Sequence, residues 1–337
     1  MANVIFQTDR LSVEQYSPTD EDHFFRLNSD QLVMRYIRLI SDRDESKHFL
    51  LQNIKGYDKN PMTGRWAVRA RDDGRFVGTF AILPMEQSND WHVGYALLAP
   101  EWGKGFATEL VDTGISYAFR KMLLPRLMAI VEQDNERSVN VLRKMGFRQV
   151  QNIHQEGKDL FRFELVNPAV IETERLLIAA LDLEQFENYI KAGNELERAL
   201  GLREGHRIVS EALLEMIEQF SLPAMQKADG DNYYFFTLWI VVDKSANQLV
   251  AELGFKGIPN TRGEVEIGYS TFPAFQQRGY MTEAVGALCD WCAGKAGIKS
   301  VTGETKTDNE PSQRVLQRNG FTLVSKRDNM LIWSKTI

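Results

Sequence analysis

Cysteine, long apolar runs and blocks of positive charge are all scarce in this 337-residue chain. Two cysteines cannot form a disulfide framework, so a reducing cytoplasm is the expected compartment. The longest run rich in apolar residues, 233–242, is too short for a membrane span of about 20 residues, and the N-terminus lacks the pattern of a secretory signal. A formal net charge of -6 argues against binding nucleic acid through its phosphates. We therefore expect a cytoplasmic protein with neither membrane nor nucleic-acid partners.

Proline and glycine, with 10 and 24 residues, are too few for a fibrous or low-complexity protein. The chain does contain an ordinary globular balance, with 43% apolar and 26% charged residues. Such a composition can fill a packed core, and the length predicts about two domains.

The chain repeats itself once. Residues 8–11 (Thr-Asp-Arg-Leu) recur 165 residues later as residues 173–176 (Thr-Glu-Arg-Leu), and a longer set of identities recurs in order at a constant separation of 174. Two long repeats indicate two similar domains, since a solenoid needs at least three short ones. The set comprises Gly94, Tyr95, Gly105, Thr108, Glu109, Asn135, Ser138, Leu142, Gly146 and Phe147, and their counterparts Gly268, Tyr269, Gly279, Thr282, Glu283, Asn309, Ser312, Leu316, Gly320 and Phe321.

The two separations differ by nine, so the second half carries an insertion of about nine residues. We expect it between Gly201 and Asn232, upstream of the matched block. The boundary is expected near Asn167 and Pro168, because proline cannot extend a central strand. The predicted domains are residues 1–167 (copy 1) and residues 168–337 (copy 2). The sequence leaves open whether they pack as an intramolecular pseudo-dimer.

Hydrophobic periodicity predicts an α+β fold, sandwich-like, with a mixed central sheet flanked by helices in each copy. In copy 2 the aromatic run 233–236 is expected in a buried strand, and an amphipathic helix is expected over 213–220. In copy 1 the expected strands are 66–71, 76–83, 91–98, 126–131 and 160–166, and the expected helices are 108–120 and 138–145.

The most informative segment joins a strand to a helix in each copy. It reads Trp-Gly-Lys-Gly-Phe-Ala-Thr-Glu at 102–109 and Gln-Gln-Arg-Gly-Tyr-Met-Thr-Glu at 276–283. Glycines allow successive N–H groups to point into one concavity, and the helix N-terminus adds free N–H groups and its dipole. This arrangement suits a pyrophosphate. A plain glycine turn is the alternative for one loop, but it explains two matching loops less well. Neither a Walker A loop nor a Rossmann fingerprint is present.

The order of these motifs resembles the GNAT superfamily of acetyl-CoA-dependent N-acetyltransferases. Each copy has a strand with Gly-Tyr, the loop and its helix, another strand, and then Asn-x-x-Ser-x-x-x-Leu-x-x-x-Gly-Phe. Thr-Asp/Glu-Arg-Leu at each start resembles the RimJ/RimL-like branch. Trp102, where Gln or Arg is commonest, and Met281, where Gly or Ala is usual, depart from the pattern.

The resemblance covers almost the whole chain and implies acetyl-CoA as co-substrate, with no metal. By position, the implied CoA contacts are Leu97, Leu98, Gly103, Lys104, Gly105, Phe106, Ala107, Thr108 and Asn135 in copy 1, and Thr271, Phe272, Gln277, Arg278, Gly279, Tyr280, Met281, Thr282 and Asn309 in copy 2.

The resemblance also implies where acetyl transfer takes place. In that superfamily the strand before the loop parts from its neighbour, and its free backbone groups hold the pantetheine arm. Strand alternation puts Glu264 and Glu266 on one face, and the family position favours Glu266 as the general base, in an apolar cleft that raises its pKa. A solvated surface carboxylate is the alternative. Copy 1 has Asp90 and His92 there, and His92 is either a base or a structural histidine.

Two short helices supply the remaining candidates. Helix capping is the plain interpretation of Asn135, Ser138, Asn309 and Ser312. The resemblance implies instead that each Asn contacts the CoA arm and each Ser lies near the sulfur. Neither helix has the tyrosine that many GNAT enzymes use as an acid, so Ser138 or Ser312 becomes the candidate donor to the leaving thiolate.

Cys289 and Cys292 form a Cys-x-x-Cys pair, but two thiols alone cannot make a four-ligand zinc site. The pair falls in the helix after the second loop, and a half-buried helix face is the expected setting.

The sequence thus predicts an enzyme, a tandem GNAT-fold N-acetyltransferase. It transfers an acetyl group from acetyl-CoA to a primary amine by direct attack in a ternary complex, and the amine belongs to a protein N-terminus or a small molecule. Copy 2 is the favoured catalytic copy because it has Glu266 and a loop that begins with Gln276. Copy 1 keeps the Asn-x-x-Ser motif, so the sequence leaves open whether one or both copies are active. The alternative is a non-catalytic acyl-CoA-binding or scaffold protein with degenerate acceptor sites, which His92 and the missing tyrosine favour.

Overall fold

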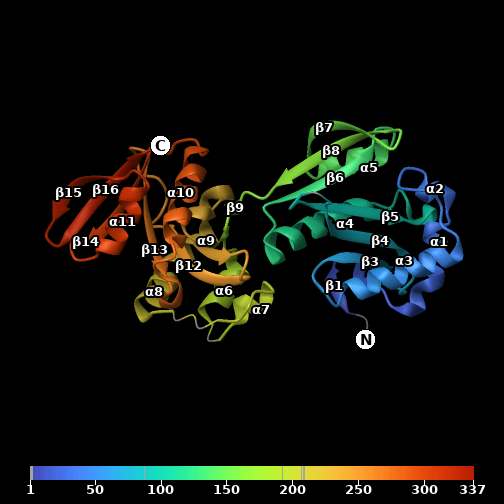
Figure 1. The fold of residues 1–337 in the computed structure, drawn as a ribbon, viewed down its shortest axis with the longest axis horizontal. Coiled ribbons are helices and arrows are strands. Elements are labelled where there is room, and N and C mark those ends of the chain that lie inside the picture. The colour runs from blue at the N-terminus through green and yellow to red at the C-terminus, as the bar shows by residue number, and fades with distance from the viewer. Residues whose placement is uncertain (1–2, 87, 192, 206, 208) are drawn as a thin grey trace. The chain divides into compact units, whose positions relative to one another are not determined.

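The computed structural model describes residues 3–86, 88–191, 193–205, 207 and 209–337. The chain divides into two compact units, Met1–Asn167 and Pro168–Ile337. Each unit has its own sheet and helices (Figure 1). In the described parts of the chain, no helix is both long and apolar enough to cross a membrane.

Both units have the same order of strands, and they differ in the helices between the second and third strands. The elements of copy 1 are β1 Val4–Gln7, β2 Leu11–Gln15, the 3₁₀ helix η1 Pro18–Asp20, α1 Glu21–Asn28, α2 Gln31–Met34, α3 Arg43–Gly56, β3 Gly64–Ala70, β4 Phe76–Pro84, β5 Trp91–Leu97, η2 Ala99–Glu101, α4 Phe106–Ser116, the π-helical turn η3 Tyr117–Lys121, β6 Arg126–Glu132, α5 Glu136–Lys144, β7 Arg148–Gln155 and β8 Lys158–Val166.

Those of copy 2 are β9 Val170–Glu172, β10 Leu176–Ala180, α6 Leu183–Ile190, α7 Glu195–Ala199, α8 Glu211–Met216, the π-helical turn η4 Ile217–Ser221, α9 Leu222–Lys227, the 3₁₀ helix η5 Gly230–Phe235, β11 Leu238–Asp243, β12 Gln248–Phe255, β13 Glu264–Thr271, η6 Pro273–Phe275, α10 Tyr280–Ala293, β14 Ser300–Lys306, α11 Glu310–Arg318, β15 Thr322–Arg327 and β16 Met330–Thr336.

The described strands form an eight-stranded sheet in each unit. Their order is β1-β2-β3-β4-β5-β6-β8-β7 in copy 1 and β9-β10-β11-β12-β13-β14-β16-β15 in copy 2, which is the same topology. One central pair in each sheet is parallel, β5 with β6 and β13 with β14, and the other neighbouring strands are antiparallel. The predicted α+β fold with a mixed sheet, built twice, is confirmed.

The two parallel pairs part early. Strands β5 and β6 are paired only at His92 and Met128. Strands β13 and β14 are paired over four positions, ending at Ile267 and Gly303. Among the described residues, the last part of β5 and of β13 therefore has a strand partner on one side only. This is the parted pair of strands that the resemblance implies.

Helices cover both faces of the copy 1 sheet. Helix α4 packs on the face that carries Trp66 and Phe80, where Leu110 is fully buried. Helices α1 and α3 pack on the opposite face through Phe24 and Leu50 (Figure 1). Because side chains alternate along a strand, residues 93, 95 and 97 of β5 face α4, and residues 92, 94 and 96 face α1 and α3.

The prediction of a strand over 233–236 is wrong. Tyr234 and Phe235 lie in the 3₁₀ helix η5, and strand β11 begins at Leu238. Both rings pack against Trp291, with centroid distances of 5.6 and 6.0 Å. A strand would send consecutive rings to opposite faces, whereas a tight helical turn brings both to one side.

Two smaller expectations for copy 2 also differ from the structure. The predicted helix over 213–220 is divided into α8 and a π-helical turn, in which Ile217 is buried and Phe220 is exposed. Cys289 and Cys292 are fully rather than half buried in α10. Burial raises the pKa of Cys289 to about 11 and that of Cys292 to about 12, so both are unreactive thiols at neutral pH.

Candidate active site

The loop between β5 and α4 turns on two glycines in the left-handed region, Gly103 with φ of 76° and Gly105 with φ of 82°. In copy 2, Gly279 keeps the second turn with φ of 78°, and Gln277 adopts the first with φ of 63°. Helices α4 and α10 begin directly after the second turn, and no side chain of the described residues caps them. The N–H groups of each first turn are therefore left to bind an anion.

An arginine from the start of each copy braces this loop. In copy 2, Arg175 Nε donates to Glu283 Oε2 over 2.6 Å, and Arg175 Nη1 donates to the loop carbonyl of Arg278 over 3.1 Å. In copy 1, Arg10 makes the same two contacts, with Glu109 and with the loop carbonyl of Lys104, over 2.7 and 3.0 Å. The arginine of each Thr-Asp/Glu-Arg-Leu motif thus pairs with the glutamate of the Thr-Glu motif in the same copy.

We expect Arg175→Ala to weaken acetyl-CoA binding at copy 2 about tenfold, roughly 1.4 kcal/mol. The loop carbonyl loses its donor and Glu283 loses its ion pair, keeping only the Thr173 hydroxyl and the backbone N–H of residue 175, so the loop N–H groups are no longer held in one arrangement. Calorimetric titration measures the change. Arg262→Ala is the matched control, because that arginine is exposed and pairs with Glu264 outside the loop. Equal affinities for the two variants would contradict the brace.

Trp102 makes the same kind of hydrogen bond as Gln276, its counterpart in copy 2. Trp102 Nε1 donates to the carbonyl of Leu97 over 2.8 Å, and Gln276 Nε2 donates to the carbonyl of Thr271 over 3.2 Å. In each copy, the first residue of the loop is therefore tied to the last residue of the strand. The substitution preserves the geometry at the start of the loop.

The cation in the loop has different neighbours in the two copies. Lys104 Nζ lies 2.9 Å from Glu101, which also lies 3.4 Å from Arg75. In copy 2, Phe275 takes the place of Glu101, and no carboxylate of the described residues pairs with Arg278. Copy 2 therefore presents its loop cation without a neutralising partner.

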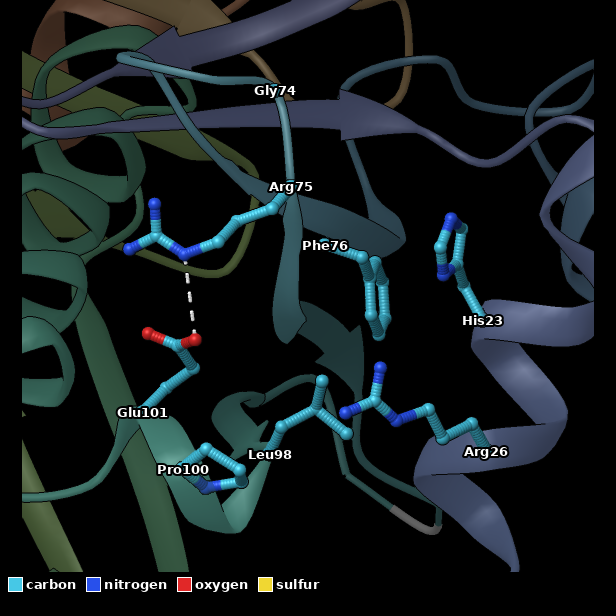
Figure 2. Close-up of a pocket in the computed structure, with 8 residues that line it drawn as sticks. All are labelled: His23, Arg26, Gly74, Arg75, Phe76, Leu98, Pro100 and Glu101. Carbon is cyan, nitrogen blue, oxygen red and sulfur yellow. Dashed lines mark hydrogen bonds and ion pairs between the residues drawn. The ribbon is translucent and has the colours of Figure 1, made fainter.

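A pocket of about 260 Å³ adjoins the copy 1 loop (Figure 2). His23 and Arg26 reach it from α1, and Glu101 lies on the loop side. The ring of His23 stacks on Phe76 with a centroid distance of 5.0 Å. The corresponding hollow of copy 2 is only about 20 Å³, and residues of the inserted segment, including Arg207, line it. The insertion thus narrows the space beside the second loop.

Glu266 lies on β13, one position before that strand parts from β14. Its carboxylate pairs with Lys256 Nζ, and its side chain is 31% exposed. Lys256 also lies 3.8 Å from Glu304. The expected apolar surroundings are therefore not found, because the carboxylate of Glu266 pairs with a lysine that also lies near a second carboxylate. The position of Glu266, beside the point where β13 and β14 part, agrees with the sequence analysis.

His92 lies at the position where β5 pairs with β6, before the two strands part. Burial lowers its pKa, and the positive charge of Arg65 lowers it further. The imidazole is therefore neutral at neutral pH and able to accept a proton. Asp90, by contrast, pairs with Arg126 and Arg162 over 2.6 and 3.2 Å, which makes it a structural carboxylate.

The two predicted asparagines cap their helices. Asn135 Oδ1 accepts from the backbone N–H of Ser138, and Asn309 Oδ1 accepts from that of Ser312, each over 3.2 Å. Capping thus accounts for one oxygen of each asparagine and leaves the amide NH₂ groups for other contacts.

A tyrosine from the strand reaches each short helix. The hydroxyl of Tyr95 lies 3.0 Å from Ser138 Oγ, and the hydroxyl of Tyr269 donates to the carbonyl of Ser312 over 3.0 Å. Burial raises the pKa of Tyr95, and that of Tyr269 to about 12, so both are protonated donors. The sequence analysis missed this role, although Gly-Tyr repeated at the fixed separation was a signal for it.

The parted strands, the left-handed loop and the helix N-terminus together define an acetyltransferase of the GNAT type. The family model described as "Acetyltransferase (GNAT) domain" matches residues 10–148 and again residues 175–322. The chain belongs to this family and contains its domain twice. The predicted class of enzyme, an acetyl-CoA-dependent acyltransferase, is confirmed.

Individual relatives match about one copy or less. The chain is similar to the uncharacterized N-acetyltransferase YoaA of Bacillus subtilis, with 30% identity over 172 residues, 49% of this chain and 97% of that protein. It is 36% identical over 76 residues to spermidine N(1)-acetyltransferase of Escherichia coli, which is 22% of this chain and 41% of that protein. The GNAT-family acetyltransferase structure from Bacillus anthracis matches with 20% identity and a TM-score of 0.43, over 48% of this chain and 97% of that one.

Proposed function

We propose that this protein moves the acetyl group of acetyl-CoA to a primary amine, of a protein N-terminus or of a small molecule. The observation that carries the proposal is the junction of two features in each copy: a strand with a free edge runs directly into a loop with left-handed turns and an uncapped helix. The loop N–H groups suit a pyrophosphate, and the free strand edge suits the amides of a pantetheine arm.

The residues of the transfer follow from this placement. The amine nitrogen attacks the thioester carbonyl, a C–N bond forms and the C–S bond breaks. The amine proton passes to a base, Glu266 in copy 2 and His92 in copy 1. Glu266 now pairs with Lys256, so an incoming ammonium group would compete with that lysine for the carboxylate.

The departing thiolate needs a proton or a hydrogen bond. In copy 1 the pair of Ser138 and Tyr95 offers two hydroxyl groups within 3.0 Å of each other. In copy 2, Ser312 offers its hydroxyl, and Tyr269 supports the backbone of the same residue. The two hydroxyl groups of copy 1 form a network in which each hydrogen bond strengthens the other, so together they can stabilise the thiolate better than serine alone.

Copy 2 is the favoured catalytic copy, because it combines Glu266 with a loop cation that has no carboxylate partner among the described residues. The similarity of part of the chain to spermidine N(1)-acetyltransferase supports a small-molecule amine as the acceptor. A protein N-terminus is the second candidate acceptor, because the Thr-Asp/Glu-Arg-Leu motif at the start of each copy resembles the RimJ/RimL-like branch.

A thiol-release assay tests the proposal. The full-length protein is mixed with acetyl-CoA and a panel of polyamines, amino acids and short peptides, and the free thiol of CoA is measured. We expect amine-dependent release with at least one member of the panel. Binding of acetyl-CoA without release for any amine would favour the alternative, a non-catalytic acyl-CoA-binding protein.

A further inference from the structure

Two arginines of copy 1 share one aromatic ring. The guanidinium carbons of Arg38 and Arg65 lie 4.5 and 5.6 Å from the ring centroid of Phe49, on helix α3. Arg65 lies on β3 opposite Ala81, and Ala81 lies opposite residue 94 of β5. Directly opposed residues point to one face of a sheet, so Arg65 and His92 lie on the same face.

No carboxylate of the described residues lies within 4.0 Å of either guanidinium group. The nearby Asp20 pairs with Arg69 instead. Arg38 donates to the amide oxygen of Asn28, and its Nε is buried without a hydrogen-bond partner. Arg38 and Arg65 are each only partly exposed.

Two such cations are costly in a folded protein unless a counter-charge is supplied. Burial, and then the charge of Arg65, lowers the pKa of Arg38 to about 10, and burial also lowers that of Arg65. Both groups stay charged at neutral pH, because the guanidinium group of arginine is not deprotonated in proteins. The backbone of Arg65 is fixed as well, since its carbonyl accepts from Asn53 Nδ2 over 2.7 Å and from the hydroxyl of Tyr57. The pair is thus held in place without an internal anion.

The same face of copy 2 has the opposite character. Leu238 stands at the position of Arg65, and Glu266 at that of His92. Glu252 stands at the position of Thr79 and is buried, where it accepts from the hydroxyl of Tyr189. The cations near this face of copy 2 have carboxylate partners, because Lys256 pairs with Glu266 and Arg207 with Glu197. Cations without a carboxylate partner among the described residues are therefore a feature of copy 1 here and not a requirement of the fold.

We propose that copy 1 accepts an amine that also carries a carboxylate, which Arg38 and Arg65 bind while the amine lies beside His92. The inference rests on the proposed acetyl transfer. The carboxylate itself is not altered in the reaction, and its role is to orient the amine and to select the acceptor.

The test uses full-length protein with Gly279→Glu, so that only copy 1 can turn over. Thiol release is compared for alanine, glutamate and phenylalanine, for their carboxamides, and for O-phosphoethanolamine. We expect kcat/KM to be at least tenfold higher for the carboxylates than for the carboxamides. Arg65→Leu introduces the residue that copy 2 has at this position, and it should abolish the preference for carboxylates by raising their KM. Arg65→Lys should restore part of that preference. The affinity for acetyl-CoA should not change.

Equal rates for acids and carboxamides would overturn the inference, and a preference for O-phosphoethanolamine would overturn the choice of carboxylate. If no amine is acetylated, calorimetry with N-acetylalanine and N-acetylalaninamide on the CoA-saturated protein decides. Preferential binding of the acid that is lost in Arg65→Leu supports the carboxylate site even though acetyl transfer itself has failed. Equal binding, or none, rejects it.

Discussion

Replacing Gly279 by glutamate is expected to lower the affinity of copy 2 for acetyl-CoA at least a hundredfold, about 2.7 kcal/mol. The residue has φ of 78°, so any side chain strains the turn, and an added Cβ would lie in contact with the brace, 3.5 Å from Arg175 Nη2. A carboxylate there also repels the pyrophosphate that the helix N-terminus attracts. Calorimetric titration should show the number of acetyl-CoA sites falling by one.

The chain offers matched controls for this change. Gly105→Glu is the same substitution in copy 1, where the added Cβ would lie 3.4 Å from Arg10 Nη2, and it should remove the other site. Gly297→Glu introduces similar left-handed strain, with φ of 90°, but meets no atom within 4 Å and lies after α10. It should leave binding unchanged. Full affinity in the Gly279 variant would reject the loop as the pyrophosphate site.

Glu266→Gln is expected to reduce kcat of copy 2 by about a hundredfold to a thousandfold, the usual contribution of a general base. Glutamine keeps the shape of the side chain but cannot take a proton from the ammonium group. Thiol release should be measured with Gly105→Glu in the same chain, so that copy 1 does not contribute. The affinity for acetyl-CoA should stay the same, because Glu266 belongs to the acceptor side.

Glu264→Gln is the control for this second change. Glu264 lies on the same strand face two residues earlier and pairs with Arg262 over 2.7 Å, away from the parted strands. Its replacement should leave kcat intact. Lys256→Met removes the present partner of Glu266 without removing the carboxylate, and separates loss of the base from loss of the ion pair. Undiminished turnover in Glu266→Gln would show that another group takes the proton.

The fold and the position of the loop were predictable because both depend on patterns repeated along the chain. Ten identities at one separation mark the tandem, and period-two alternation correctly separates Glu266 from the buried Val265 and Ile267. Glycine in the loop also predicts the left-handed turns that are observed at Gly103 and Gly105. The strand alternation and the turns of the loop are local features, so neighbouring residues carry enough information to specify them.

The partners of the site residues were not predictable, because they come from distant parts of the chain. The brace joins residues 99 and 108 positions apart in the two copies, and Tyr95 meets Ser138 across 43 positions. The carboxylate of Glu266 forms an ion pair with Lys256, where the resemblance had implied an apolar cleft. Periodicity tells which face a side chain takes, but not which charge another strand or helix brings to it.

The brace also limits how the tandem can be cut into separate halves. Arg175 stands seven residues after Pro168, between the short edge strand β9 and strand β10. A fragment that starts after this arginine would still contain every loop and helix residue matched above, yet would lack the guanidinium that holds its loop. Fragments meant for separate assay should therefore begin at Pro168 or earlier, and an inactive shorter piece would say nothing about the chemistry of copy 2.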